Sequence, residues 1–85
     1  MSYDLIVGRQ AKKEVKTLDL PTVRRIEVRF KELSNNPFDA RISKAIKMMP
    51  GRRTSRVGDW RIIYEVRESE KIIEVISIWP RGKAY

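Results

Sequence analysis

Residues 60–79 read WRIIYEVRESEKIIEVISIW, and this stretch decides the fold. Trp60–Val66 alternates apolar and polar side chains, which is typical of a β-strand with one buried face. Ile72–Trp79 is almost entirely apolar, as expected of a central strand. The polar residues between the two runs predict a hairpin turn. The stretch therefore predicts two adjacent antiparallel strands in the middle of a sheet.

Two further strands are predicted outward from this pair. Arg52–Val57 is predicted as a strand, because the tight connection Gly58-Asp59 would join it to the run that follows. Ser2–Val7 is a short, largely apolar run and is predicted as an edge-forming strand. The sequence thus predicts a sheet of four strands.

Helices are predicted where apolar residues recur at helical spacing. The first runs from Arg9 to about Leu18. Pro21 or Thr22 starts the second, because proline suits a first helical turn. The apolar stripe of this second helix consists of Val23, Ile26, Phe30 and Leu33. A third, short helix is predicted over Asp39–Met49, with Asp39 as its N-cap.

The predicted elements give an α+β fold class. An N-terminal strand and a helical hairpin are expected to pack on a twisted, mostly antiparallel four-stranded sheet. Eighty-five residues make one domain, residues 1–85, because the chain is too short for a second core. No membrane span is expected, since no stretch approaches the ~18 apolar residues that a spanning helix needs.

The net charge of +8 is large for a chain of 10.0 kDa, and it is unevenly distributed. From Arg41 to Arg61 the sequence holds seven basic residues and one acid, Asp59. A chain this basic attracts polyanions by releasing their counterions. Nucleic acid is therefore the first expected partner and an acidic protein the second, ahead of a merely charged surface.

Histidine and cysteine are absent from the sequence. It therefore offers no disulfide, no thiolate metal ligand and no histidine base for chemistry near neutral pH. The acids form no metal-ligand or paired-carboxylate pattern, so neither a metal nor another cofactor is expected. The lack of cysteine fits a reducing cytoplasm, where we expect the protein to act.

Three segments resemble a known family. They are Asn36-Pro37-Phe38, the run RVGDWRIIYEV at residues 56–66 and the run WPRGKAY at residues 79–85. Together they resemble the RelE toxins of type II toxin–antitoxin systems, which belong to the RelE/ParE superfamily. The ending PRGKAY resembles RelE more closely than ParE.

The resemblance implies two helices packed on a twisted, mostly antiparallel sheet. It implies a metal-independent endoribonuclease, an mRNA interferase that cuts mRNA on the ribosome and so inhibits translation. It also implies three partners: a cognate RelB-like antitoxin that neutralises the toxin, the ribosome with its mRNA, and operator DNA contacted only through the toxin–antitoxin complex. No membrane partner is implied.

The resemblance also implies roles for individual residues. Arg61 matches the strand arginine that contacts the scissile phosphate, and Arg81 matches the arginine that supports charge on the leaving group. Tyr85 matches an aromatic residue that stacks on a base and orients the RNA. Arginine suits these phosphate contacts because its planar fork binds phosphate oxygens in pairs and keeps its charge.

The general base is left open by the same resemblance. Arg56 matches one of two basic positions that some family members fill with lysine, as a base or a charge stabiliser. Thr54 occupies the other position, which departs from the pattern. A one-residue shift would let Arg53 take that place, although such a shift reverses the face of a strand. General phosphate contacts are expected from Arg52, Lys44, Lys47 and Lys83.

Two other functions stay open at this point. One is a ParE-like toxin that inhibits DNA gyrase by binding, and the other is a non-catalytic nucleic-acid-binding module. Some prominent residues are instead interpreted as structural. Trp60 and Tyr64 are expected in the core, on the face opposite Arg61, and Trp79 is expected to close the end of the sheet.

Overall fold

The structure is a computed structural model, and it describes residues 2–80. Its elements are β1 (Asp4–Val7), α1 (Arg9–Val15), α2 (Leu20–Asn35), β2 (Lys44–Ala45), β3 (Arg52–Val57), β4 (Trp60–Arg67) and β5 (Ile72–Pro80). The strands form one sheet in the order β1-β5-β4-β3-β2, with β1 parallel to β5 and the other neighbouring pairs antiparallel. The α+β class, the edge position of β1 and the central position of β5 are confirmed. No helix within the described range is long and apolar enough to cross a bilayer.

The predicted strand number and the predicted third helix are wrong. The sheet has five strands rather than four, because Lys44–Ala45 forms β2 instead of part of a helix over Asp39–Met49. A carboxylate oxygen of Asp39 accepts the backbone N–H of Arg41, two residues further on, at 3.0 Å. Such a contact offers the backbone a turn in place of the first turn of a helix. The segment therefore folds as turns and a short edge strand.

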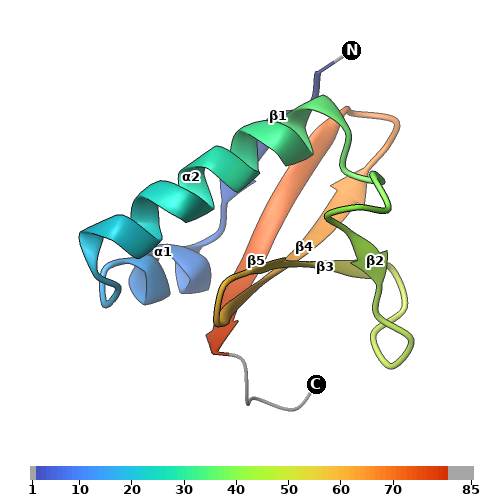
Figure 1. Ribbon diagram of the computed structural model, residues 1–85. Helices are drawn as coiled ribbons and strands as arrows, with labels where there is room; N and C mark the ends of the chain where they lie inside the picture. Colours follow the sequence, from blue (N-terminus) through green and yellow to red (C-terminus); the bar gives the residue numbers. More distant parts are fainter. Residues whose placement is uncertain (1, 81–85) are drawn as a thin grey trace.

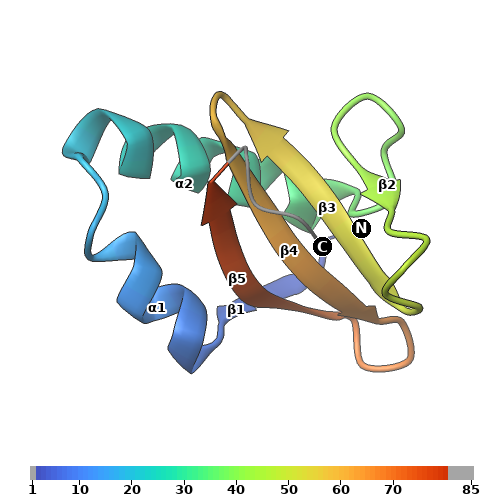
Figure 2. The ribbon, with the colours of Figure 1, turned by 90° about the horizontal axis from the view of Figure 1, so that it is seen from below.

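The helices pack on one face of the sheet (Figure 1). Helix α1 lies against β5, and α2 reaches across towards β1 and β3. In Figure 2 the strands lie in front of α2, so the viewer looks at the face that no helix of residues 2–80 covers. The core fills the space between the two layers, where Tyr64 is fully buried and Trp60 packs against it, as expected.

Polar side chains cap helix α2 and attach helix α1 to the sheet. The carboxylate of Asp19 accepts the backbone N–H of Thr22 at 3.2 Å and its hydroxyl at 2.7 Å, which caps α2 at its start. On α1, one carboxylate oxygen of Glu14 accepts the hydroxyl of Ser77 at 2.8 Å and the N–H of Ile78 at 2.7 Å. These two residues lie beyond the part of β5 that β1 pairs. Glu14 therefore satisfies a strand edge that would otherwise be open.

Candidate nucleic-acid interface

The hairpin of β3 and β4 carries the candidate site. Its two-residue turn is Gly58-Asp59, and Gly58 has a φ of +58°, a backbone conformation that suits glycine. Side chains alternate along a strand, so opposite residues of an antiparallel pair share one face. The pairs that contain the core residues Ile62 and Tyr64 face the helices. The pairs between and beside them therefore point to the open face.

Three pairs of β3 and β4 share this open face: Arg56 with Arg61, Thr54 with Ile63, and Arg52 with Glu65. The last pair is an ordinary cross-strand ion pair, with 3.1 Å between Arg52 Nε and Glu65 Oε2. The first pair places two positive charges directly opposite each other, which is unfavourable in a sheet. An anion bound beside Arg56 and Arg61 would offset that repulsion.

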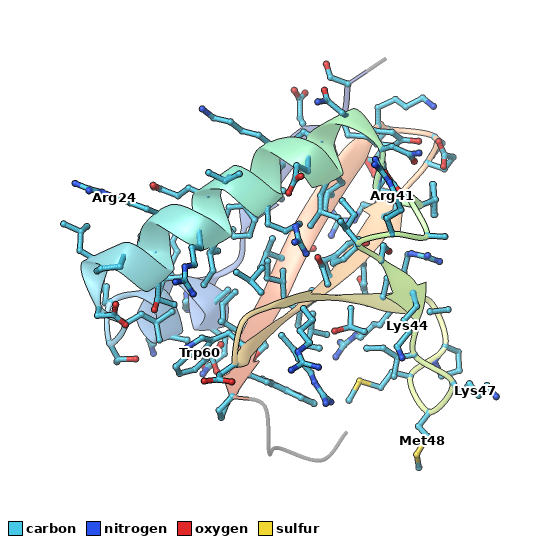
Figure 3. All side chains as sticks on the ribbon, viewed as in Figure 1. Arg24, Arg41, Lys44, Lys47, Met48 and Trp60 are labelled. Atoms are coloured by element: carbon cyan, nitrogen blue, oxygen red, sulfur yellow. The ribbon has the colours of Figure 1, made fainter. Side chains whose placement is uncertain are left out.

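A cleft of about 520 Å³ lies beside this arginine pair. Five of its nine lining residues are basic and none is acidic; the basic ones are Arg29, Arg41, Lys44, Arg56 and Arg61. In Figure 3, Arg41 and Lys44 lie on the segment that flanks the first half of β3, whereas Arg24 projects from the far side of α2. Segments distant in the sequence thus gather positive charge around one hollow.

Arg29 connects α2 to the floor of the cleft. One of its terminal nitrogens donates to Ser55 Oγ at 2.8 Å and to the backbone carbonyl of Arg56 at 2.7 Å. Its Nε donates to the carboxylate of Glu32 at 2.9 Å, one turn further along the helix. The guanidinium of Arg29 therefore holds the backbone of β3 in place at Arg56.

A chain of hydrogen bonds on the helix side of the sheet holds Ser43, which lines the cleft, in place. Arg53 lies opposite Tyr64 and so faces the helices, where its Nε donates to Ser43 Oγ at 2.8 Å and its guanidinium lies 5.1 Å from the centre of the Phe38 ring. The hydroxyls of Ser43 and Tyr64 are hydrogen-bonded, and Tyr64 donates to the carbonyl of Pro37 at 2.7 Å. Arginine only donates and a carbonyl only accepts, so Ser43 donates to Tyr64.

Two titratable groups beside the cleft have shifted pKa values. Burial raises the pKa of the Tyr64 hydroxyl, and contacts with Ser43 and Arg53 oppose that shift in part. The side chain and backbone N–H of Arg41 lower the pKa of Asp39 to about 2. Asp39 is therefore ionised at neutral pH and holds the exposed guanidinium of Arg41 at the rim, with 2.8 Å between Nη2 and Oδ2.

The structure brings three predicted site residues together in the cleft: Arg56, Arg61 and Lys44. It separates three others from them. Arg52 shares the open face but is paired with Glu65, and Arg53 lies on the opposite face of the sheet. Lys47 is exposed on the turn beyond β2 and does not line the cleft (Figure 3).

The remaining site predictions, for Arg81, Lys83 and Tyr85, lie outside the described residues. Trp79 is the penultimate residue of β5 and lies opposite Arg61, consistent with its expected place at the end of the sheet.

Sequence reasoning missed Arg29 and Arg41 as cleft residues. Arg29 stands three positions after Ile26 and four before Leu33, both of which are buried. That spacing places Arg29 on the inner face of α2 and was a usable signal. Arg41 gave no comparable signal, because its position depends on the turn that replaced the predicted helix.

The cleft's residues define what chemistry it can perform. Guanidinium and ammonium groups donate hydrogen bonds, carry charge at neutral pH and bind phosphate oxygens. They can stabilise negative charge on phosphorus, but arginine keeps its proton and is therefore a poor proton carrier. Within residues 2–80, no group of three His, Cys, Asp or Glu is placed to hold a metal ion. The site is therefore suited to bind and stabilise a phosphate.

Solved toxin structures share this fold. The archaeal RelE–RelB complex of Pyrococcus horikoshii matches with a TM-score of 0.84 and 25% identity, over 99% of this chain and 100% of that chain. The intact RelBE toxin–antitoxin complex of E. coli matches with a TM-score of 0.81 and 19% identity, over 98% and 100%. The YoeB/ParE toxin of Agrobacterium tumefaciens matches with a TM-score of 0.77 and 20% identity, over 91% and 96%.

Comparison of sequences identifies the family as well as the fold. No curated protein sequence matches the chain. A family model does: the ParE toxin of the type II toxin–antitoxin system, parDE, matches residues 5–85. The match covers nearly the whole sequence and includes both strands of the hairpin that carries Arg56 and Arg61. The chain therefore belongs to the ParE toxin family, and with it to the RelE/ParE superfamily of type II toxins.

Proposed function

We propose that this toxin is a ribosome-dependent mRNA endoribonuclease that inhibits translation in the cytoplasm. One observation carries the proposal: Arg56 and Arg61 lie directly opposite each other on the open face, beside a cleft with five basic lining residues and no acidic one. A cluster of this kind suits the phosphate of a single RNA strand. The cleft, with a volume of about 520 Å³, offers a place for that strand. No helix of residues 2–80 covers this face of the sheet (Figure 2).

The proposed reaction is attack of an RNA 2′-hydroxyl on its neighbouring phosphorus. The bond to the 5′ oxygen of the next nucleotide breaks, which leaves a 2′,3′-cyclic phosphate. The 2′ proton passes to water, and the leaving 5′ oxygen takes a proton from water. In this reaction Arg61 and Arg56 stabilise the negative charge that develops on phosphorus, a term often worth ~3–4 kcal/mol per donor. From the resemblance, Arg81 supports the leaving oxygen and Tyr85 stacks on a base. Arg53 is assigned a positioning role, because its side chain supports Ser43 from the other face.

Dependence on the ribosome follows from what this cleft lacks. Its lining contains no histidine, aspartate or glutamate, the side chains that most often serve as general bases. The toxin alone should therefore be a slow catalyst. The ribosome would hold the RNA in an attack geometry, and such positioning can lower a barrier by ~7–11 kcal/mol.

We further propose that a RelB-like antitoxin neutralises the toxin, and that operator DNA is contacted only through their complex. Two of the similar solved structures are toxin–antitoxin complexes. The net charge of +8 favours an acidic partner. Covering the basic cleft would exclude RNA from it.

A second candidate function is inhibition of DNA gyrase by binding. It is favoured by one observation, the match of residues 5–85 to the ParE toxin model. The arginine pair in the cleft is explained less directly by this function, because an inhibitor that binds a protein needs no phosphate site.

One experiment separates the two functions. The toxin is expressed without its antitoxin, and new mRNA 5′ ends are mapped against ribosome positions. We expect cuts within the ribosomal A site and a halt in protein synthesis. DNA damage without new mRNA ends would instead support gyrase inhibition and overturn the nuclease proposal.

A further inference from the structure

Thr54 Oγ1 stands out among the buried polar atoms of the protein. The residue lies in the middle of β3 and is only 6% exposed. Within the described part of the chain, this hydroxyl is a buried side-chain group without a hydrogen-bond partner. Leaving a buried hydroxyl unpaired typically costs ~1–3 kcal/mol. Such a cost at a residue that lines a cleft points to a partner that arrives with a ligand.

The surroundings of Thr54 indicate what that partner is. On the open face Thr54 lies opposite Ile63, and the Arg52–Glu65 ion pair lies on one side of it. On the side of the cleft its neighbours are Lys44 on β2, Arg56 along its own strand and Arg61 diagonally across on β4. These cations only donate hydrogen bonds. The other hydroxyl in the lining, that of Ser43, is already engaged with Arg53 and Tyr64. Thr54 Oγ1 is thus a buried acceptor without a partner, and the neighbouring side chains that line the cleft are donors.

A ribonucleotide matches this arrangement of donors and acceptor. Its phosphate offers only acceptors, which suit the cations, and its 2′-hydroxyl offers a donor close to that phosphate. Deoxyribose lacks this hydroxyl, which is the group by which proteins tell RNA from DNA. A phosphate alone would leave the acceptor capacity of Thr54 unused.

We propose that Thr54 is a specificity residue that accepts a hydrogen bond from the 2′-hydroxyl of bound RNA and so selects RNA over DNA. The inference deepens the proposed function, on which it rests in taking RNA as the ligand. The side chains around Thr54 are long and flexible, and a phosphate attracts them. Binding of the RNA backbone therefore draws these cations to the phosphate and uncovers the hydroxyl.

The test compares two matched substitutions in the full chain. Thr54→Val keeps the shape of the side chain but removes its hydroxyl, and Thr54→Ser keeps the hydroxyl. Fluorescence anisotropy measures the binding of a labelled RNA hexamer and of the DNA hexamer of the same sequence, at one fixed salt concentration. Arg61→Ala serves as a control that should weaken both complexes alike.

We expect the wild type and Thr54→Ser to prefer RNA about five- to tenfold, the ordinary effect of one hydrogen bond. Thr54→Val should lose this preference through weaker RNA binding, with unchanged DNA binding and an unchanged or higher melting temperature. The inference is overturned if the wild type binds both hexamers equally, or if Thr54→Val keeps the RNA preference.

The same data separate this inference from the proposed nuclease activity. Binding preference is measured on free oligonucleotides, whereas cleavage is measured on ribosomes. RNA preference that is lost in Thr54→Val supports the inference even if no mRNA is cut. Cleavage with an unchanged preference in Thr54→Val overturns the inference and leaves the nuclease proposal standing.

Discussion

At the scale of single residues, the pairing of Arg56 with Arg61 is an unfavourable feature of the sheet surface. Two like charges at directly opposite positions repel each other, and no acid lines the adjoining cleft. Arg56 has a contact of its own, from Nε to the carbonyl of Gly58 at 3.1 Å, which aims its side chain along the turn. A pair kept despite repulsion is typical of a site that binds an anion.

The repulsion between Arg56 and Arg61 predicts that removing either charge changes stability little but lowers activity strongly. Arg56→Ala and Arg61→Ala should each leave the free energy of unfolding within about 1 kcal/mol of wild type, because one partner of a repelling pair is removed. Ribosome-dependent cleavage should fall about 100-fold or more. Arg24→Ala is the matched control, since it removes the same charge from an exposed site on the far side of α2 (Figure 3). Melting curves and cleavage rates on the same preparations test the prediction; cleavage near the wild-type rate in both variants would contradict it.

The Tyr64 hydroxyl gives a second prediction at this scale. Tyr64→Phe removes the hydrogen bond to Pro37 and leaves Ser43 without its acceptor, so the free energy of unfolding should drop by about 1–3 kcal/mol. Denaturant unfolding at pH 7 measures the loss. Tyr3→Phe, whose hydroxyl bonds Glu68 at an exposed site, serves as the control and should cost less.

The contribution of Tyr64 should also depend on pH. Because burial raises its pKa above the ordinary value near 10, the folded state favours the neutral hydroxyl. This stabilisation is fully present below pH ~10 and is lost as the pH rises through the folded-state value. The difference in unfolding free energy between wild type and Tyr64→Phe should therefore shrink in alkaline solution. A constant difference from pH 8 to pH 11 would show that Tyr64 does not titrate in this way.

At the scale of elements, the strands were the most predictable part. Their alternation and the turn at Gly58-Asp59 are local signals, and three strands formed at or near their predicted bounds. The helix predicted over Asp39–Met49 was wrong, because the apolar residues of this segment fit helical spacing although it folds as turns and a short strand. Its true partners are distant: Lys44 pairs with Thr54 and Ala45 with Arg53 across a turn. The spacing of apolar residues within one segment carries no information about pairing with a distant strand.

The candidate site was predictable to the extent that it lies on one hairpin. Arg56 and Arg61 could be placed on a shared face from the turn and from strand alternation alone. The contributions of Arg29 and Arg41 could not be placed so, because they depend on how α2 and the segment before β2 dock beside β3. Thr54 was visible only as a departure from the family pattern. Its unpaired hydroxyl required the packed structure.

The start of α2 gives a prediction at this scale. Asp19→Ala removes the side chain that caps the first turn, so the free energy of unfolding should fall by about 1 kcal/mol. Glu27→Ala, at an exposed position of the same helix, is the control and should change stability little. Thermal melting compares the two. Equal melting temperatures for Asp19→Ala and Glu27→Ala would mean that the cap contributes nothing.

At the scale of the whole molecule, charge and shape act together. The helices and the main core cluster occupy one side of the sheet, and basic residues from α2, β2, β3 and β4 meet at one cleft. In the proposed function, the net charge of +8 draws the molecule towards RNA and the cleft holds the RNA backbone. In this account the net charge attracts RNA, whereas the residues of the cleft position its backbone.

This division predicts steep salt dependence with a local origin. If about four to six phosphates of single-stranded RNA are contacted, the logarithm of the binding constant should fall with the logarithm of salt concentration at a slope of about −3 to −4. Arg61→Ala should reduce the slope by nearly one unit, and Arg24→Ala should reduce it less. Titrations between low and physiological salt measure these slopes. A flat response would show that the basic cleft does not contact the RNA backbone.

The central claim is that the arginine pair supplies charge stabilisation while the ribosome supplies positioning. The most direct measurement adds purified toxin to free mRNA and to ribosomes programmed with the same mRNA, and compares wild type with Arg61→Ala and Arg24→Ala. The account predicts efficient cutting only on ribosomes, by wild type and Arg24→Ala but not by Arg61→Ala. Comparable cutting of free and ribosome-bound mRNA, or full activity of Arg61→Ala on ribosomes, would contradict it.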